Sequence, residues 1–243
     1  GAIHALKEKW GDKVHEKTMF CGDSIGAILS LQLAIGYSAK EIELVARNIF
    51  RKMRTEPHYF YGHDYWLNQY IDHLMSKYPE LYKTIKGKYK CGTTTFPFTH
   101  QWHDTWESNE DLSKCLKAST NIPIYCSRCE KINDTEVIDG AYGFNGQQFP
   151  HGNETLFIGA NQPSAEVSYD LTYNEMGFPD NRLIFNELFK KGYECFKQWD
   201  GSQKNKIESR KPNYVALIVC WVGKAIQMFY DYTRELVKEE DKL

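Results

Sequence analysis

The sequence has no marked excess of charge of either sign. Its 243 residues include 30 Lys and Arg against 32 Asp and Glu, which gives a formal net charge of −2. Proteins that bind a nucleic-acid backbone or an anionic membrane surface through charge usually carry a basic excess or a basic patch. The composition therefore argues against nucleic acid as a partner and against a basic membrane-binding surface.

The sequence also lacks an apolar run long enough to cross a bilayer, which takes about 20 residues. Its most apolar stretch, 215–222, belongs to a helix that we predict over Tyr214–Lys238, and Lys224 interrupts the apolar pattern. We interpret this helix as a core element, with contact to a membrane surface as the alternative. The first ten residues contain His, Lys and Glu and do not form a secretory signal peptide.

A disulfide or zinc framework is missing as well. The seven cysteines are odd in number and scattered along the chain, so we expect reduced thiols and an intracellular protein. Cys126 and Cys129 form a C-x-x-C without the second pair that a zinc site of this type needs. His58, His63, His100 and His103 show no recurring metal-ligand spacing, and we interpret them as surface or packing residues. We expect no metal and no other cofactor.

The residues that are present suit one packed α/β domain. Aromatic residues make up 14% of the chain, which argues against disorder, and a chain of this length can bury a large core. We predict an α/β domain over 1–199, a polar connector over 200–213 and a C-terminal helix over 214–243. Periodicity and turn residues predict further helices at Gly1–Trp10, Ala27–Ile35, Ser38–Arg54, Tyr65–Tyr78, Asn109–Ala118 and Asn181–Trp199, and strands at Thr18–Cys21, Thr93–Phe96 and Glu136–Asp139.

The first candidate for chemistry is a G-x-S-x-G motif at Gly22–Gly26. It lies between the predicted strand that ends at Cys21 and the apolar helix that begins near Ala27. Strand, tight turn and helix form the context of a nucleophile elbow, in which glycines leave room for neighbouring backbone and the serine hydroxyl stands clear. We predict that Ser24 is a nucleophile and that the Ile25 amide, at the start of the helix, donates to a developing oxyanion.

A second candidate is Asp139, which ends a short apolar strand and precedes Gly140. Ligand-binding residues of α/β sheets collect at the carboxyl ends of strands. The same pair of residues could instead be an ordinary Asp-Gly turn. His151 follows in the sequence and could complete a Ser, Asp, His order, as in the triads of α/β-hydrolases.

Four segments agree, in order, with one family. Gly22–Gly26 and the helix after it look like a nucleophile motif and its sequel, and Ala118–Tyr125 is similar to an A-S-x-x-I-P-x-Y segment. Val137–Asn145 looks like a D-G-G/A motif with a trailing Asn, and Phe185–Tyr193 is similar to a late helix. Through these segments, residues 1–199 resemble the patatin-like phospholipases, most closely their adiponutrin-like, triacylglycerol-lipase branch.

The resemblance implies a three-layer α/β fold with a mostly parallel central sheet, and a catalytic Ser–Asp dyad in place of a triad. On this basis Ser24 is the nucleophile and Asp139 the general base. Gly22, Gly26, Gly140 and Ala141 are motif positions. The implied activity is hydrolysis of an acyl ester of a lipid, either a phospholipid or an acylglycerol, through an acyl-enzyme and without a cofactor. The implied location is the cytoplasm or the periphery of a membrane or lipid droplet.

The sequence departs from the family pattern in three places. Ala141 stands where Gly is commoner, and Gln147 replaces a usual Pro. In the family a glycine-rich oxyanion loop precedes the first helix, whereas the segment from Gly1 matches sequence after that loop. We therefore expect an N-terminal truncation, with the remaining oxyanion donors upstream of Gly1. The alternative function is a catalytically inactive patatin-like protein that acts as a lipid-binding or interaction module.

Overall fold

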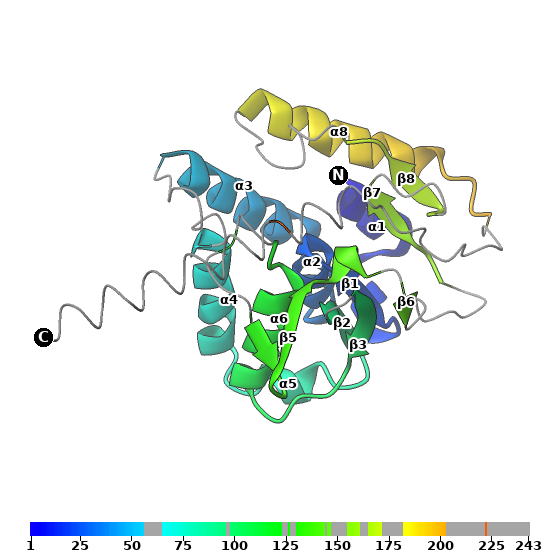
Figure 1. Ribbon diagram of the computed structural model, residues 1–243. Helices are drawn as coiled ribbons and strands as arrows, with labels where there is room; N and C mark the ends of the chain where they lie inside the picture. Colours follow the sequence, from blue (N-terminus) through cyan, green and yellow to red (C-terminus); the bar gives the residue numbers. More distant parts are fainter. Residues whose placement is uncertain are drawn as a thin grey trace, which may run out of the picture.

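The computed structural model describes residues 1–55, 65–95, 98–122, 126, 130–143, 145–146, 155–160, 165–171, 182–202 and 222 (Figure 1). Within these ranges the protein is a mixed α/β structure. Several predictions concern residues outside them, namely His58, His63, Cys129, Gln147, His151 and, apart from Val222, the helix over 214–238. Among the described residues, no helix has both the length and the apolar character that crossing a bilayer requires.

The main sheet has six strands in the order β4-β5-β2-β3-β6, with β1 also paired to β2. A separate pair is formed by β7 and β8. The strands span β1 Phe20–Asp23, β2 Tyr89–Thr95, β3 Thr99–His103, β4 Glu130–Ile132, β5 Thr135–Asp139, β6 Asn145–Gly146, β7 Ile158–Ala160 and β8 Val167–Tyr169. The three predicted strands are present, although β1 runs two residues further than predicted and β2 begins four residues earlier.

The prediction of a mostly parallel sheet is wrong, because the sheet is mixed. β1–β2 and β3–β6 are parallel, whereas β2–β3, β2–β5 and β4–β5 are antiparallel. For β2–β3 and β4–β5 the physical reason is a short connection, which can join only antiparallel neighbours. Asn133 and Asp134 link β4 to β5 with φ angles of 49° and 62°. Two successive residues at positive φ form the tight turn that suits the twist of a hairpin, and Asn and Asp tolerate it.

One edge of β2 carries two strands end to end. β1 pairs with the first half of β2, up to Asp23 opposite Gly92. β5 pairs with the second half, and its last residue, Asp139, lies opposite Thr93. Both strands must use the same edge, because β3 occupies the other edge alongside Cys91–Thr95. Since β1 is parallel and β5 antiparallel to β2, their carboxyl ends meet at the middle of this edge.

The helices span α1 Ala2–Trp10, α2 Ile25–Ala34, α3 Ala39–Thr55, α4 Tyr65–Lys77, α5 Leu81–Thr84, α6 Asn109–Ser119 and α8 Arg182–Gln198, with short 3-10 turns η1 Asp12–Glu16 and η2 Gly140–Tyr142. The predicted helices in these ranges are confirmed. A capping box precedes α3, because the Ser38 amide donates to Glu41 at 2.8 Å and the Glu41 amide donates to the Ser38 hydroxyl at 3.2 Å.

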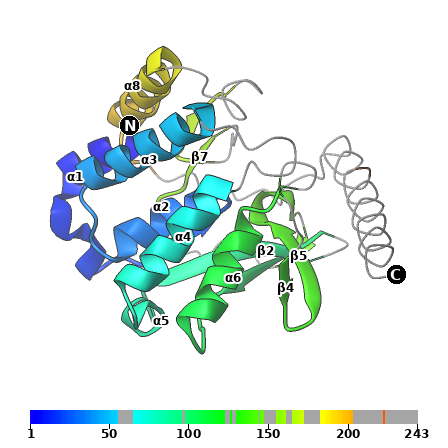
Figure 2. The same cartoon turned by 90° about the vertical axis from the view of Figure 1, so that its left-hand side faces the viewer.

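The main core lies between the sheet and two helices on one of its faces. α2 and α6 both pack on the face that carries Tyr89 and Cys91, and α4 lies beside α6 (Figure 2). The Tyr89 hydroxyl donates to the Ala27 carbonyl oxygen at 2.9 Å, and the Cys91 thiol lies 3.7 Å from the Cys115 carbonyl oxygen. These contacts fix where the start of α2 and the end of α6 lie relative to the middle of β2.

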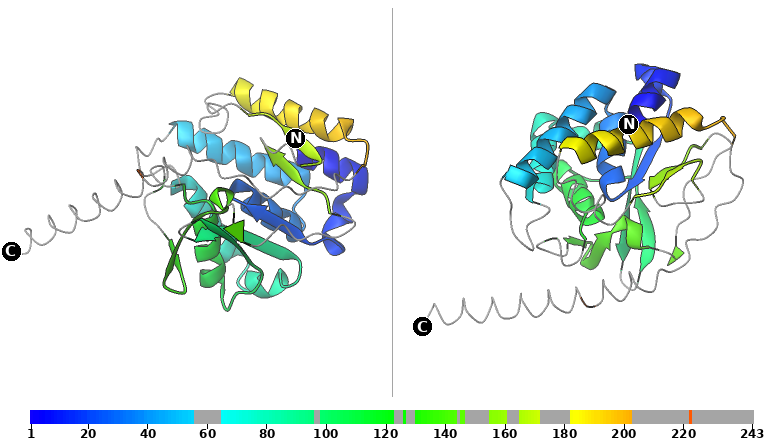
Figure 3. Two further views of the ribbon diagram at one scale, coloured as in Figure 1. Left: turned by 45° about the vertical axis from the view of Figure 1, so that its right-hand side comes forward. Right: turned by 90° about the horizontal axis from the view of Figure 1, so that it is seen from above.

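A second, smaller core joins the two ends of the described chain. α8 lies along α1 and contacts β8, and residues of all three belong to one apolar cluster (Figures 1 and 3). Its buried members are Ala2, Ala5, Leu6, Val167 and Phe196. This second core packs residues from the start of the chain against residues near position 196.

We expect Leu116→Ala to destabilise the protein by about 2–5 kcal/mol, because it opens a cavity in the main core. Leu116 of α6 is fully buried there. Leu44→Ala is the matched control, since Leu44 of α3 is 55% exposed and its truncation should change stability by less than about 0.5 kcal/mol. Urea unfolding followed by circular dichroism measures both. Similar losses in the two variants would contradict this assignment of the core.

Candidate active site

Ser24 lies on a strained turn between β1 and α2. Asp23 ends the strand, Ile25 begins the helix, and Ser24 has φ 57° and ψ −138°. A positive φ is uncommon for a residue with a side chain and marks strain that the surrounding structure must hold. The predicted strand, tight turn and helix are therefore present, and the serine has the strained backbone of a nucleophile elbow.

The two glycines of the G-x-S-x-G motif have different roles. A Cβ atom at Gly22 would lie 2.2 Å from the Gly26 carbonyl oxygen, so the turn closes only because position 22 has no side chain. A Cβ atom at Gly26 would meet nothing within 4 Å. The expectation that both glycines leave room for neighbouring backbone is correct for Gly22 and wrong for Gly26, which lies in the first turn of α2.

The two residues predicted as a dyad are in contact. The Ser24 Oγ donates to Asp139 Oδ2 at 2.5 Å, although 115 residues separate them in sequence. Asp139 is only 1% exposed. Its second carboxylate oxygen accepts from the Ala141 amide at 2.8 Å, and its own amide donates to the Asn121 carbonyl oxygen at 3.0 Å. The side chain and the backbone of Asp139 are thus both held in place.

The contact arises from the shared edge of β2, where β1 and β5 end opposite Gly92 and Thr93. The two side chains converge where β1 and β5 end, but β1 and β5 are not neighbours in the sheet. They follow one another along the same edge of β2, and this places the residue after Asp23 beside Asp139.

Ser119, at the end of α6, is a site residue that the sequence reasoning did not identify. Its hydroxyl accepts from the Ser24 amide at 3.0 Å and donates to the Gly92 carbonyl oxygen at 2.6 Å. Ser119 is fully buried, so this hydroxyl bridges the elbow to β2 in a site without competing solvent. The available signal was its place in the Ala118–Tyr125 segment, which agreed with a family motif and had no assigned chemistry.

The first amides of α2 are candidate donors for an oxyanion hole. In any α-helix the first N–H groups have no carbonyl four residues earlier to pair with, and they carry the positive end of the helix dipole. Ile25 is the first residue of α2, and the residue is 50% exposed. The Ile25 amide therefore meets the local requirement for a donor beside Ser24. The further donors expected upstream of Gly1 stay a prediction.

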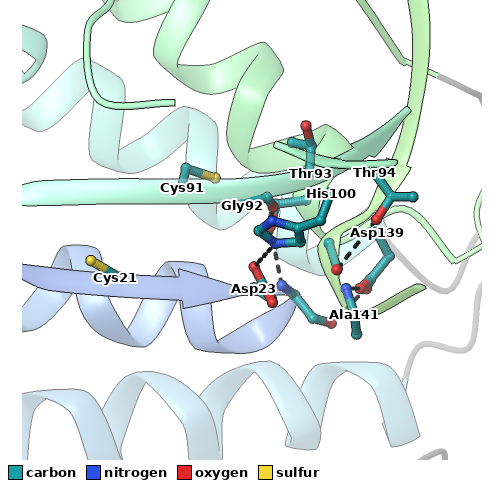
Figure 4. A network of polar contacts seen from close by, with 12 residues as sticks. Cys21, Asp23, Cys91, Gly92, Thr93, Thr94, His100, Asp139 and Ala141 are labelled. Carbon is teal, nitrogen blue, oxygen red and sulfur yellow. Dashed lines mark hydrogen bonds and ion pairs between the residues drawn. The ribbon is translucent and has the colours of Figure 1, made fainter. Parts of the chain in front are cut away.

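A second polar pair lies next to the dyad, where Figure 4 shows Asp23 and His100 pointing toward each other. His100 Nε2 lies 2.9 Å from Asp23 Oδ1. Of the two interpretations of His100, as a surface or a packing residue, the second is correct, because the residue is 6% exposed. His103 is also in contact with a polar group, since its Nε2 lies 2.8 Å from the Thr93 hydroxyl. The sequence of β3 alone does not indicate which of its side chains lie close to the dyad.

In the described part of the chain, neither a reactive thiol nor a metal-binding cluster is an alternative to Ser24 as the reactive group. Cys21 is the nearest thiol along β1, and burial raises the pKa of its thiol to about 11, so the thiolate is scarce at neutral pH. Among the described residues, no group of three or more His, Cys, Asp and Glu side chains could hold a metal ion. Cys126 is buried, and its thiol lies 3.6 Å from the Thr120 carbonyl oxygen.

Comparison with known proteins adds no assignment. No protein-family model matches the chain, and no curated protein matches it either. The patatin-like resemblance of the motifs therefore stays a hypothesis, and the case for a function depends on the geometry of the site.

We expect Gly22→Ala to destabilise the protein by about 3 kcal/mol, because the new methyl group would overlap backbone atoms of the elbow. A Cβ there would lie 2.2 Å from the Gly26 oxygen and 2.6 Å from the Ala27 nitrogen. Gly26→Ala is the control within the same motif, and we expect unchanged stability or a gain of up to about 1 kcal/mol, as for other helical Gly→Ala changes. Thermal unfolding of the two variants measures the difference, and equal losses would show that the elbow geometry is not as described.

Proposed function

We propose that this protein is a serine acyl hydrolase of the patatin-like kind, which cleaves an acyl ester of a lipid with a Ser24–Asp139 dyad. The observation that carries the proposal is the 2.5 Å hydrogen bond from Ser24 Oγ to Asp139 Oδ2 at a strained strand-to-helix turn. A general base must lie within hydrogen-bond reach of the group whose proton it takes, at most about 3.2 Å between the two heavy atoms, and this contact meets that requirement. Ser24 and Asp139 therefore hold the geometry of a nucleophile and its base.

In the first half of the reaction, Ser24 Oγ attacks the ester carbonyl carbon while its proton passes to Asp139 Oδ2. The carbonyl oxygen becomes an oxyanion, which the Ile25 amide stabilises at the start of α2. The tetrahedral intermediate then collapses, the carbon–oxygen bond to the alcohol breaks, and the proton on Asp139 moves to the leaving alkoxide. The products are a free alcohol and an acyl group bound to Ser24.

In the second half, water attacks the acyl carbon of this ester. Asp139 accepts one proton of the water, and then returns it to Ser24 Oγ as the acyl–oxygen bond breaks. A free carboxylic acid leaves, and the dyad is restored. The Ala141 amide, 2.8 Å from Asp139 Oδ1, holds the carboxylate so that Oδ2 keeps facing the serine in both halves. Ala141 needs only its backbone for this contact, which explains why a methyl group is accepted where Gly is commoner.

The lipid substrate and the family are the parts of the proposal that depend on the sequence resemblance. We propose a phospholipid or an acylglycerol as the substrate, a three-layer patatin-like fold, and an intracellular protein at a membrane or lipid-droplet surface. The mixed α/β structure supports the broad fold class, with α2 and α6 packed on one face of the sheet. The half-exposed Ile25 side chain supports an apolar approach to Ser24.

Replacing either dyad residue should abolish hydrolysis with little change in stability. We expect Ser24→Ala and Asp139→Asn to lower kcat by about 10³-fold or more, as removal of a nucleophile or its base does in other serine hydrolases. Turnover of a fluorogenic acyl ester and labelling by a fluorophosphonate probe measure this loss. Ser113→Ala is the matched control, since Ser113 is a buried serine of α6 that contacts Asp72.

The control should be labelled and active like the wild type. A wild-type protein that neither labels nor turns over any ester of a lipid panel would contradict the proposed function. It would favour an inactive lipid-binding or interaction protein instead, which vesicle co-sedimentation would then test.

A dyad and a triad make opposite predictions for His151, which lies outside the described residues. Because Asp139 contacts Ser24 directly, no histidine is required between them, and we expect His151→Ala to keep kcat within about twofold of wild type. Ester turnover by this variant decides the question. A loss on the scale of the Ser24→Ala variant would establish a Ser–His–Asp mechanism and overturn the dyad.

A further inference from the structure

The side chains of Asp23 and His100 meet across a strand that lies between them. Asp23 belongs to β1 and His100 to β3, while β2 pairs with both strands. The side chains are 8% and 7% exposed, and His100 Nε2 lies 2.9 Å from Asp23 Oδ1. An ionised carboxylate can only accept hydrogen bonds, so the imidazole nitrogen donates. Two side chains from the strands on either side of a middle strand can touch only if no side chain of the middle strand lies between them.

Gly92 meets this requirement, because it has no side chain. In β2 it lies opposite Asp23 on one side and opposite Trp102 on the other. A Cβ atom at Gly92 would lie 1.8 Å from Asp23 Oδ1 and 2.7 Å from His100 Nε2. The pair therefore occupies the volume that a side chain at this position would fill. Trp102 closes one side, since its ring meets that of His100 edge to face with centroids 4.7 Å apart.

The segment that follows Asp139 closes the other side of the pair. A Cβ atom at Gly140 would lie 2.9 Å from Asp23 Oδ1, and one at Gly143 would lie 2.6 Å from His100 Cβ. The turn η2, with Gly143 after it, is thus packed closely on both partners of the pair. Asp23 is bonded covalently to Ser24, and its carboxylate lies against the residue next to Asp139. The pair touches the chain segments that carry both members of the dyad.

From this arrangement we propose that Asp23 and His100 are positioning residues, which hold Ser24 and Asp139 in hydrogen-bonding geometry. The inference rests on the proposed function, because it assigns the pair a role in that reaction. Catalytic groups must be held within about 0.5 Å of their productive positions, and a displacement near 1 Å can cost about 10²-fold in rate. Removing one partner leaves the other buried without its bond, which favours movement of β1 or η2 away from the pair.

Two substitutions of His100 that differ by one methylene group test the inference. His100→Gln can place an amide N–H near the position of Nε2, whereas the shorter His100→Asn cannot. We expect His100→Asn to lower kcat by about 10–100-fold with KM within about twofold, and His100→Gln to recover most of the loss. Asp23→Asn, which keeps an acceptor oxygen, should also retain most of the activity. Equal losses in the Gln and Asn variants of His100 would overturn the proposal.

A control variant with a similar loss of stability separates a positioning role from general destabilisation. Tyr70→Phe leaves the buried Gln32 amide without the 2.6 Å bond to the Tyr70 hydroxyl, at a point on α2 eight residues after Ser24. Eight residues of helix correspond to about 12 Å. This variant should lose stability like His100→Asn, as measured by urea unfolding, and keep the kcat of wild type. A matching loss of kcat in Tyr70→Phe would show that the effect is not specific to the pair.

A readout that needs no activity keeps this inference separate from the proposed function. In ¹H–¹⁵N spectra, the amides of Ser24 and Ala141 report on the bonds to Ser119 and Asp139. Both resonances should shift in His100→Asn and stay near wild-type positions in His100→Gln and Tyr70→Phe. If His100→Asn does not fold, the Asp23→Asn, His100→Asn double variant removes the buried charge and is compared instead. Unchanged amides would overturn the positioning role, whereas an inactive wild type with shifted amides would contradict only the hydrolase.

Discussion

The site depends on the pairing of two strands with one edge of β2. β1 ends opposite Gly92, and β5 ends opposite Thr93. A slip of two residues in either ladder would move the strand end by about 7 Å and separate Ser24 from Asp139. A slip of one residue would turn the terminal side chains to the opposite face of the sheet. Strand register, fixed by many backbone hydrogen bonds and by the core beneath Tyr89 and Cys91, therefore sets the distance between the two residues.

The backbone of Ser24 is unfavourable by itself, and its neighbours hold it. A residue with a side chain at positive φ costs on the order of 1–3 kcal/mol. The Ser24 amide donates to Ser119, its hydroxyl donates to Asp139, and its carbonyl oxygen accepts from the Ala27 amide at 2.9 Å. Each such bond contributes about 0.5–1.5 kcal/mol net, so together they offset a strain of this size. Three different elements supply the partners, which explains why the elbow requires the whole domain to be folded.

Much of the local structure could be predicted from the sequence, whereas the contacts between elements could not. Ser24 and Asp139 stood out because glycine, an acidic residue and an apolar strand pattern occur within a few residues of each. The mixed character of the sheet was missed, because the Asn133-Asp134 hairpin turn has no glycine and its strands are short. Ser119 and His100 were missed for another reason. A serine at the end of a helix and a histidine in a strand have no local signature, and only the pairing of distant strands gives them neighbours.

Contacts on both faces of the sheet hold the elbow, and these contacts depend on which residue precedes Ser24 in the sequence. Ser119 reaches the Ser24 amide from α6, on the face of Tyr89 and Cys91. Asp23 lies opposite Gly92 and therefore projects to the other face, where it meets His100. Because side chains alternate along a strand, the side chain of the residue before the serine must project to the face that α6 does not cover. An acidic residue at this position is consistent with a buried donor on that face, so Asp23, like Gly22, is set by the packing around the elbow.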